Sequence, residues 1–245
     1  MDFSADEFSY KKILNLSNKN LNTIEHLDLY KYESLTEFNC SFNNLTQLCD
    51  NLPTTLQILI CSNNKLTRLD YLPNSLTKLD CDYNKIVSLN NLPNSLIMLN
   101  CSNNPLISLD CLPNGIQILI CTNTKIKLLD NLPNSLIKLN CEFNDIVSLD
   151  NLPNSLIELQ CNNNQLYTLD HLPKNLQILF CSNTKIKQLD NLPNNLVKLY
   201  CSNNYIKKFN HLPDKLSTLY CPRNSIQLTK SLNNELHKRK YKLTV

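Results

Sequence analysis

The sequence predicts an α/β-type repeat solenoid that is mostly β, with one parallel sheet on its concave face. Nine Leu-Pro pairs place their prolines 20 residues apart without exception, from Pro53 to Pro213. Ten of the twelve cysteines recur every 20 or 21 residues, from Cys40 to Cys221. The 245 residues include 49 Leu and 40 Asn, because each of these residue types occupies fixed places in the repeat. Self-similarity at a period of this length is typical of solenoids.

Each repeat is expected to contain one short strand followed by a turn. Residues 56–69 show the pattern L-x-x-L-x-C-x-x-N-x-I/L-x-x-L. Side chains alternate across a strand, so we expect Leu59 and Cys61 to face the core and Ile58 and Ile60 to face the concave surface. The Asn that follows the strand is expected to hydrogen-bond to backbone groups of its turn and of the next repeat.

The return segment of each repeat contains the Leu-Pro pair. A residue before proline disfavours the helical conformation, and a 20-residue repeat has little room for a helix. We therefore expect an extended or polyproline-like convex side. Thr124 and Thr184 replace the Asn in two repeats, where we expect weaker hydrogen bonding between repeats.

These residues resemble the leucine-rich repeat, with Cys where the middle Leu usually stands. The 20-residue length and the L-P-x-x-L motif resemble the shortest class, found in bacterial effectors of the YopM and IpaH type. The use of Asn, Ile, Lys and Cys also resembles leucine-rich repeat proteins of amoeba-infecting giant viruses. IpaH-like effectors carry a ligase domain after their repeats, and because few residues follow 230 we expect no ligase activity here.

The chain is predicted to consist of a solenoid with a cap at each end. The solenoid covers residues 13–229 in about 11 repeats, and its first two repeats are degenerate. Residues 1–12 are predicted to form an N-terminal cap helix, because Ser4 with Glu7 makes a capping box and Phe3 with Phe8 has the spacing of a hydrophobic staple. Residues 230–245 are basic and break the pattern, which predicts a short C-terminal cap helix.

A superperiod of 60 residues predicts a partner-binding surface. Residues 57–60, 117–120 and 177–180 read QILI, QILI and QILF. Their apolar side chains would recur every three strands on the concave face, and clustered exposed apolar and aromatic residues often mark interfaces. The alternative is that they are relics of duplication, since scattered apolar surface residues are ordinary. The predicted partner-binding residues are Ile58, Ile60, Ile118, Ile120, Ile178, Phe180, Tyr200 and Tyr220.

The cysteine column is predicted to be a buried, reduced ladder. No C-x2-C pair of the kind that binds zinc is present, and in-register parallel strands give poor disulfide geometry. Cys49 and Cys111 lie outside the column and are expected to be the more reactive thiols. The start MDFSADEFSYKK lacks the apolar segment of a secretory signal. We therefore expect a reducing, cytoplasmic location, which would be the host-cell cytoplasm for a viral protein.

Two charged columns have alternative interpretations. An acidic column lies two residues before Leu-Pro, and we expect its side chains to accept backbone N–H bonds in Asx turns. A calcium-binding edge is the alternative. A column of lysines follows the Asn positions, and we expect a solvated flank rather than a nucleic-acid surface, because the net charge is only +3. The acidic column contains Asp70, Asp110, Asp130, Asp150, Asp170 and Asp190.

The sequence contains no motif that indicates catalysis. It has a single glycine, whereas doubly wound nucleotide-binding folds need several at their phosphate turns. No stretch of roughly 18 apolar residues indicates a membrane span. We therefore expect no catalytic residues, cofactor, metal, nucleic acid or membrane partner. The sequence predicts a non-enzymatic scaffold that binds another protein on its concave face, and the alternative is a structural or self-associating, homodimeric solenoid.

Overall fold

The computed structural model describes residues 10–209, 211–226 and 242–244. The chain divides into two compact units, residues 1–124 and 125–245. The first unit contains a short 3-10 helix, η1 (Leu29–Lys31), and the strands β1 (Ile13–Asn15), β2 (Glu37–Asn39), β3 (Ile58–Ile60), β4 (Lys78–Asp80), β5 (Met98–Asn100) and β6 (Ile118–Ile120). The second unit contains β7 (Lys138–Asn140), β8 (Glu158–Gln160), β9 (Ile178–Phe180), β10 (Lys198–Tyr200), β11 (Thr218–Tyr220) and β12 (Lys242–Thr244).

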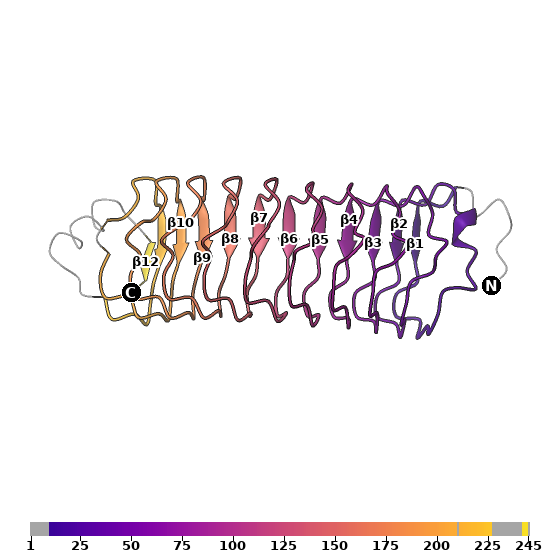
Figure 1. Ribbon diagram of the computed structural model, residues 1–245, viewed down its shortest axis with the longest axis horizontal. Helices are drawn as coiled ribbons and strands as arrows, with labels where there is room; N and C mark the ends of the chain where they lie inside the picture. Colours follow the sequence, from indigo (N-terminus) through magenta and orange to yellow (C-terminus); the bar gives the residue numbers. More distant parts are fainter. Residues whose placement is uncertain (1–9, 210, 227–241, 245) are drawn as a thin grey trace. The chain divides into compact units, whose positions relative to one another are not determined.

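Within each unit the strands pair in parallel and in chain order (Figure 1). The register follows the 20-residue repeat, because equivalent residues of neighbouring repeats lie opposite each other. Leu59 of β3 lies opposite Leu79 of β4, and Leu79 lies opposite Leu99 of β5. The 24-residue offset between β1 and β2 lengthens the connection without shifting the register, since Leu14 still lies opposite Phe38. Each unit is therefore a solenoid with a parallel sheet, as the sequence predicts.

The core of each unit is a set of stacked apolar columns. In the repeat around β3, Leu56, Leu59, Cys61, Leu66 and Leu69 are all buried. The corresponding residues of the neighbouring repeats are buried as well, so each column continues through the stack. Burial of one such Leu side chain contributes about 1.5–3 kcal/mol. A single repeat has no second layer, and its core side chains are covered only because adjacent repeats stack on them.

A column of Asn side chains joins each repeat to the one before it. Asn84 Nδ2 donates to the carbonyl of Cys81 in its own turn at 3.0 Å and to that of Cys61 in the preceding repeat at 3.0 Å. Asn84 Oδ1 accepts the N–H of Leu66 in the preceding repeat at 2.9 Å. The predicted backbone bonding is confirmed, but its direction is corrected, because the cross-repeat bonds run to the preceding repeat and not to the next.

The threonine substitutions in this column retain part of the bonding. Thr184 Oγ1 donates to the carbonyl of Cys181 at 3.3 Å, and it also contacts Asn204 Oδ1 of the following repeat. The shorter side chain has one hydroxyl in place of an amide with two donors and an acceptor. Because the hydroxyl has one proton, Thr184 donates either to its own turn or to the following repeat.

The Leu-Pro segment forms a β-turn rather than a helix. The N–H of Leu76 donates to the carbonyl of Pro73 at 3.1 Å, and the same bond recurs in the other Leu-Pro repeats. A hydroxyl beside the turn joins consecutive repeats, as when Ser75 Oγ donates to the carbonyl of Leu56 at 2.6 Å. The described residues form no α-helix, and they therefore contain no helix that is long and apolar enough to cross a bilayer.

The turn after each strand requires a left-handed backbone conformation. The second residue after the column Cys has φ between 51° and 59° in the described repeats, as in Asn63, Asn103 and Asn163. Asn tolerates this region better than other residues with a Cβ. Phe42 and Tyr83 occupy the same position in the first unit, so their exposed side chains carry a backbone cost.

The predicted caps fall largely outside the described residues. The capping box and the staple lie within residues 1–9, which are not described. Of the predicted C-terminal cap helix, residues 242–244 are described, and the prediction was wrong for them, because they form a strand, β12, that pairs with β11. Leu243 lies opposite Leu219, 24 residues earlier, which is the spacing that also separates Leu14 from Phe38.

Replacing Asn84 with Ala should lower the free energy of unfolding by about 3 kcal/mol, because buried backbone groups in two repeats lose their partner. Asn84→Thr should cost less, since Thr184 shows that a hydroxyl still reaches the carbonyl of its own turn. Urea unfolding of the full chain measures both. Asn94→Ala, at an exposed turn position, is the control and should stay within about 0.5 kcal/mol of wild type.

Gly115→Ser should raise the free energy of unfolding by about 1 kcal/mol. Gly115 occupies the hydroxyl position beside the turn, and a Cβ there would lie 3.5 Å from the carbonyl oxygen of Leu96, the counterpart of the acceptor that Ser75 bonds. Ser would add that bond and reduce the entropy of the unfolded chain. Gly115→Ala should gain only the second effect. If the Cβ is not accommodated beside the carbonyl of Asn94, 3.2 Å away, both variants will unfold more easily than wild type.

Candidate functional site

The outer sheet face consists of the first and third side chains of each strand, which point away from the core. In the first unit, Ile58 and Ile60 lie on β3 and Ile118 and Ile120 lie on β6. All four are half-buried. The strands β4 and β5 lie between them, so the two isoleucine pairs are on one face but not adjacent.

The strands between the isoleucine pairs add an apolar and an acidic residue. Met98, half-buried on β5, extends the apolar surface, although it lies outside the 60-residue superperiod. Asp80, on β4, accepts a hydrogen bond from Asn100 Nδ2 at 3.1 Å and one from the N–H of Asp82 at 3.2 Å. Burial raises the pKa of the Asp80 carboxyl. The face of this unit therefore alternates apolar side chains with half-buried polar ones, among them Asp80 and Lys78 on β4 and Glu37 on β2.

The predicted residues of the second unit form one continuous cluster, because they lie on adjacent strands. The rings of Phe180 and Tyr200 are stacked, with centroids 4.5 Å apart and planes inclined by 6°. Tyr220 continues the column at 6.2 Å from Tyr200, with its ring tilted by 49°. Ile178 lies beside Phe180 on β9, and Tyr220 is 40% exposed. We call this the aromatic column.

Polar side chains continue the outer sheet face on β7 and β8. Lys138 Nζ lies 3.3 Å from Glu158 Oε2, and Asn140 Nδ2 donates to Gln160 Oε1 at 2.9 Å. Pairs of this kind at a surface contribute little to stability. They leave the aromatic column as the apolar part of this unit's outer sheet face.

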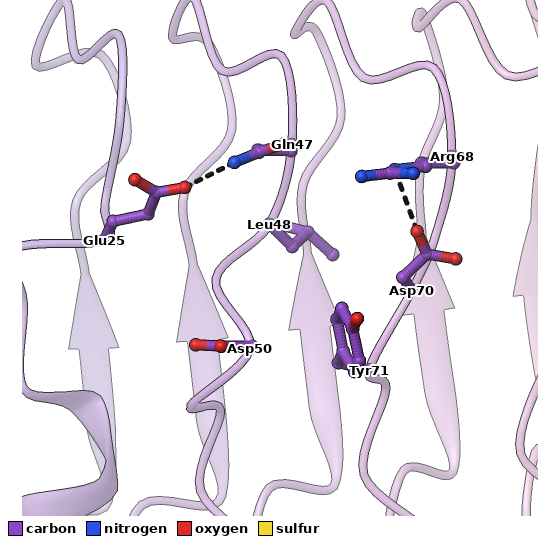
Figure 2. Close-up of a pocket in the computed structure, with 7 residues that line it drawn as sticks. All are labelled: Glu25, Gln47, Leu48, Asp50, Arg68, Asp70 and Tyr71. Carbon is purple, nitrogen blue, oxygen red and sulfur yellow. Dashed lines mark hydrogen bonds and ion pairs between the residues drawn. The ribbon is translucent and has the colours of Figure 1, made fainter.

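A pocket that the sequence analysis missed lies on the flank of the first unit, in the segments that leave the strands. It has a volume of about 250 Å³. Figure 2 shows Leu48 between two polar pairs, Glu25 with Gln47 and Arg68 with Asp70. We call it the flank pocket; its lining residues are Glu25, Gln47, Leu48, Asp50, Arg68, Asp70 and Tyr71.

The aspartates of the acidic column bond to side chains at several positions. Asp70 Oδ2 lies 2.8 Å from Arg68 Nε, and Asp130 Oδ1 accepts from Asn151 Nδ2 at 3.1 Å. Asx turns occur instead at the third strand position, where Asn39 Oδ1 accepts the N–H of Ser41 at 3.0 Å. Among the described residues, no group of three or more His, Cys, Asp or Glu side chains is arranged to hold a metal ion.

Ser148, Asp150 and His171 lie together but in the wrong order for a nucleophilic triad. Ser148 Oγ donates to Asp150, and His171 Nδ1 lies 3.1 Å from the other oxygen of the same carboxylate. The Ser148 hydroxyl and His171 lower the pKa of this exposed carboxyl. Hydrolase triads place the histidine between the hydroxyl and the carboxylate. Here the carboxylate is in the middle, so the histidine does not activate the serine.

The ten column cysteines are buried free thiols. Cys81 Sγ donates to the carbonyl of Asn100 in the next repeat at 3.3 Å. Burial raises the pKa of Cys40 and Cys121 to about 12. Of the two thiols predicted to be reactive, Cys111 is exposed, whereas Cys49 is buried and burial raises its pKa. The prediction for Cys49 was wrong, because its side chain is only 1% exposed.

Comparison with known proteins finds similarity in solved structures. No family model and no curated protein sequence matches the chain. YopM from Yersinia enterocolitica WA-314 is 32% identical over 88% of this chain, with a TM-score of 0.73. The functional domain of InlJ from Listeria monocytogenes, which includes a cysteine ladder, is 31% identical over 94% of this chain, with a TM-score of 0.76. The chain spans about half the length of these two, 51% and 53%.

A third similar structure is an assembly of two proteins. One chain of the LRIM1/APL1C complex is 25% identical to this protein, with a TM-score of 0.71. The match covers 86% of this chain and 44% of the chain in the complex. The similarity to YopM confirms the resemblance to short-repeat effectors. InlJ is a similar protein whose domain also includes a cysteine ladder.

One thiol of the native protein should react rapidly with a thiol reagent at neutral pH, and that thiol should be Cys111. Ladder thiols are buried, and burial raises the pKa of Cys40 and Cys121 to about 12, which disfavours the reactive thiolate. The hydrogen bond with Cys201 lowers the pKa of Cys221, but this thiol is buried as well. Reaction with a chromogenic disulfide, before and after denaturant is added, gives the number of thiols that react in the native and in the unfolded protein. Cys111→Ser should remove the rapid phase, whereas Cys49→Ser should leave it unchanged. A rapid phase of several thiols would contradict the buried ladder.

Proposed function

The chain is a leucine-rich repeat protein with short 20-residue repeats, and on that premise we propose that it is a non-enzymatic scaffold that binds a partner protein on the outer sheet face. The observation that carries the proposal is the aromatic column of Phe180, Tyr200 and Tyr220, with Ile178 beside it. Aromatic residues are enriched at the energetic centres of protein interfaces.

The isoleucine pairs of the first unit provide a second contact area. Ile58 with Ile60 and Ile118 with Ile120 would each bury further apolar surface against a partner, which contributes about 25 cal/mol per Å². Asp80 lies between these pairs, half-buried and bonded to Asn100 and the N–H of Asp82, and would place a polar group of the partner beside it. The similarity to one member of the LRIM1/APL1C complex supports protein binding as the general role.

The alternative occupant is a second copy of this chain. The apolar residues of the two units would then contact each other between copies, and the protein would be a homodimer. Light scattering over a range of concentrations separates the two proposals. The average molar mass of a homodimer falls on dilution as it dissociates, whereas a scaffold for a different partner has the mass of a monomer at every concentration.

The proposed location is a reducing, cytoplasmic compartment, where twelve free thiols would persist. This location remains a prediction, as does the link to giant viruses.

Paired polar substitutions on the outer sheet face should abolish partner capture without unfolding the protein. Ile120→Asn places in β6 the residue that β5 and β7 carry at the third position, and Phe180→Gln does the same with the residue of β8. The fold already accepts these side chains there. We expect wild type to retain a specific protein from an extract of its natural host and the double variant to lose it by at least tenfold, with nearly equal thermal midpoints.

The matched control is Ile107→Asn, which removes an exposed isoleucine from the flank of the repeat rather than from the outer sheet face. This variant should capture the same protein as wild type. Equal capture by the outer-face variant and wild type would show that the partner binds elsewhere.

A further inference from the structure

The flank pocket is built by three consecutive repeats of the first unit. The first repeat supplies Glu25, the second supplies Gln47, Leu48 and Asp50, and the third supplies Arg68, Asp70 and Tyr71. Gln47 donates a hydrogen bond to Glu25, and Arg68 pairs with Asp70. Figure 2 shows Asp50 and Tyr71 on the same side of Leu48, with Asp50 beneath the Glu25–Gln47 pair and Tyr71 beneath the Arg68–Asp70 pair.

The residues that distinguish this pocket are not dictated by the repeat. The position of Tyr71 is Asn in five of the nine Leu-Pro repeats, and the position of Arg68 is mostly small or polar. A second hollow, of about 190 Å³, occupies the corresponding place in the second unit. There Ser148 and Asn151 stand where the flank pocket has Arg68 and Tyr71. The flank pocket is thus a specialised form of a hollow that the repeat produces.

Tyr71 occupies its position without the usual benefit of an aromatic residue. Its backbone is left-handed, with φ of 58°, whereas Asn91 and Asn131 fill the same position at 63° and 60°. The side chain is 70% exposed, so little burial offsets the backbone cost. Such a residue is a candidate for contact with a partner, although exposed rings at positive φ also occur elsewhere in the repeats, as at Tyr83.

The charges of the flank pocket favour a cation. Glu25, Asp50 and Asp70 are acidic and Arg68 is basic, so the formal charge of the lining is −2 (three minus one). The Arg68–Asp70 pair is internally neutral, at 2.8 Å, and this leaves the negative charge with Glu25 and Asp50. Leu48 and the ring of Tyr71 are the apolar part of the lining. An aromatic ring attracts a cation above its face.

We propose that the flank pocket binds one basic side chain, a lysine or an arginine, of a partner protein. The cation interacts with Glu25, Asp50 and the face of the Tyr71 ring, and the aliphatic stem of the same side chain packs on Leu48. Lysine and arginine have this combination of an apolar stem and a charged end. The inference rests on the proposed function only in assigning the basic side chain to a protein.

The test uses small probes and the full chain. The probes are N-acetyl-arginine amide, N-acetyl-lysine amide and the neutral N-acetyl-citrulline amide, each titrated into isotope-labelled protein while amide signals of residues 47–50 and 68–71 are followed by NMR. We expect both cationic probes to saturate, with half-saturation at roughly 1–10 mM as for a small ligand with few contacts. The citrulline derivative should bind at least tenfold more weakly. Salt should weaken the cationic probes several-fold, because the attraction is screened.

Two variants test the residues assigned to the site. Asp50→Asn removes one charge, and Tyr71→Asn introduces the residue that this position carries in other repeats. Each should reduce affinity for the cationic probes by about tenfold. Tyr71→Asn should also raise the thermal midpoint, so its loss of binding would not come from misfolding. Asp130→Asn, at the corresponding place in the second unit, is the matched control and should bind as wild type does.

Equal binding of the citrulline and arginine derivatives, or unchanged binding by Tyr71→Asn and Asp50→Asn, would overturn the proposal. The outer-face variant with Ile120→Asn and Phe180→Gln should keep its affinity for the probes. Loss of partner capture in that variant and loss of probe binding in the pocket variants are therefore separate results.

Discussion

The structure depends on one constraint. In every repeat the chain turns at the end of its strand within the narrow core, where the backbone N–H and C=O groups of the turn have no access to water. The Asn column meets this constraint. One side chain such as Asn84 satisfies carbonyls in two repeats and one N–H of the preceding repeat. Buried polar groups without partners cost about 1–3 kcal/mol each. The stacking of repeats and the bonding of the turns are consequently a single event, since neither can be completed by a repeat alone.

The same constraint leaves little freedom inside the solenoid. The core columns consist almost entirely of Leu, Ile and Cys, with Phe38 and Phe209 as exceptions, and Cys thiols such as that of Cys81 bond to carbonyls of the next repeat. Variation is possible at the first and third strand positions and along the flank. The aromatic column lies in the first of these regions and the flank pocket in the second. The residues that carry binding are thus those that the repeat does not specify.

Left-handed backbone positions show how function and stability compete in this chain. Asn is the residue that best combines a side chain with positive φ, and most such positions have it. Phe42, Tyr71 and Tyr83 replace it with exposed aromatic rings. Each replacement carries a backbone cost for a side chain that is more than half exposed. These departures are visible in the sequence, but only the backbone angles reveal that they carry a cost.

The sequence by itself determined the repeat length, the strand positions, the register and the buried columns, because a strict 20-residue period with alternating apolar residues has only one way to bury its core. It also placed the outer-face residues Phe180, Tyr200 and Tyr220 on one column. The tertiary structure decided what depends on contacts between repeats. It gave the direction of the Asn bonds, the burial of Cys49, the stacking of Phe180 on Tyr200 and the pocket formed by Glu25, Asp50 and Tyr71. A periodic pattern states which residues share a face, but distances across neighbouring repeats follow from backbone geometry and side-chain packing.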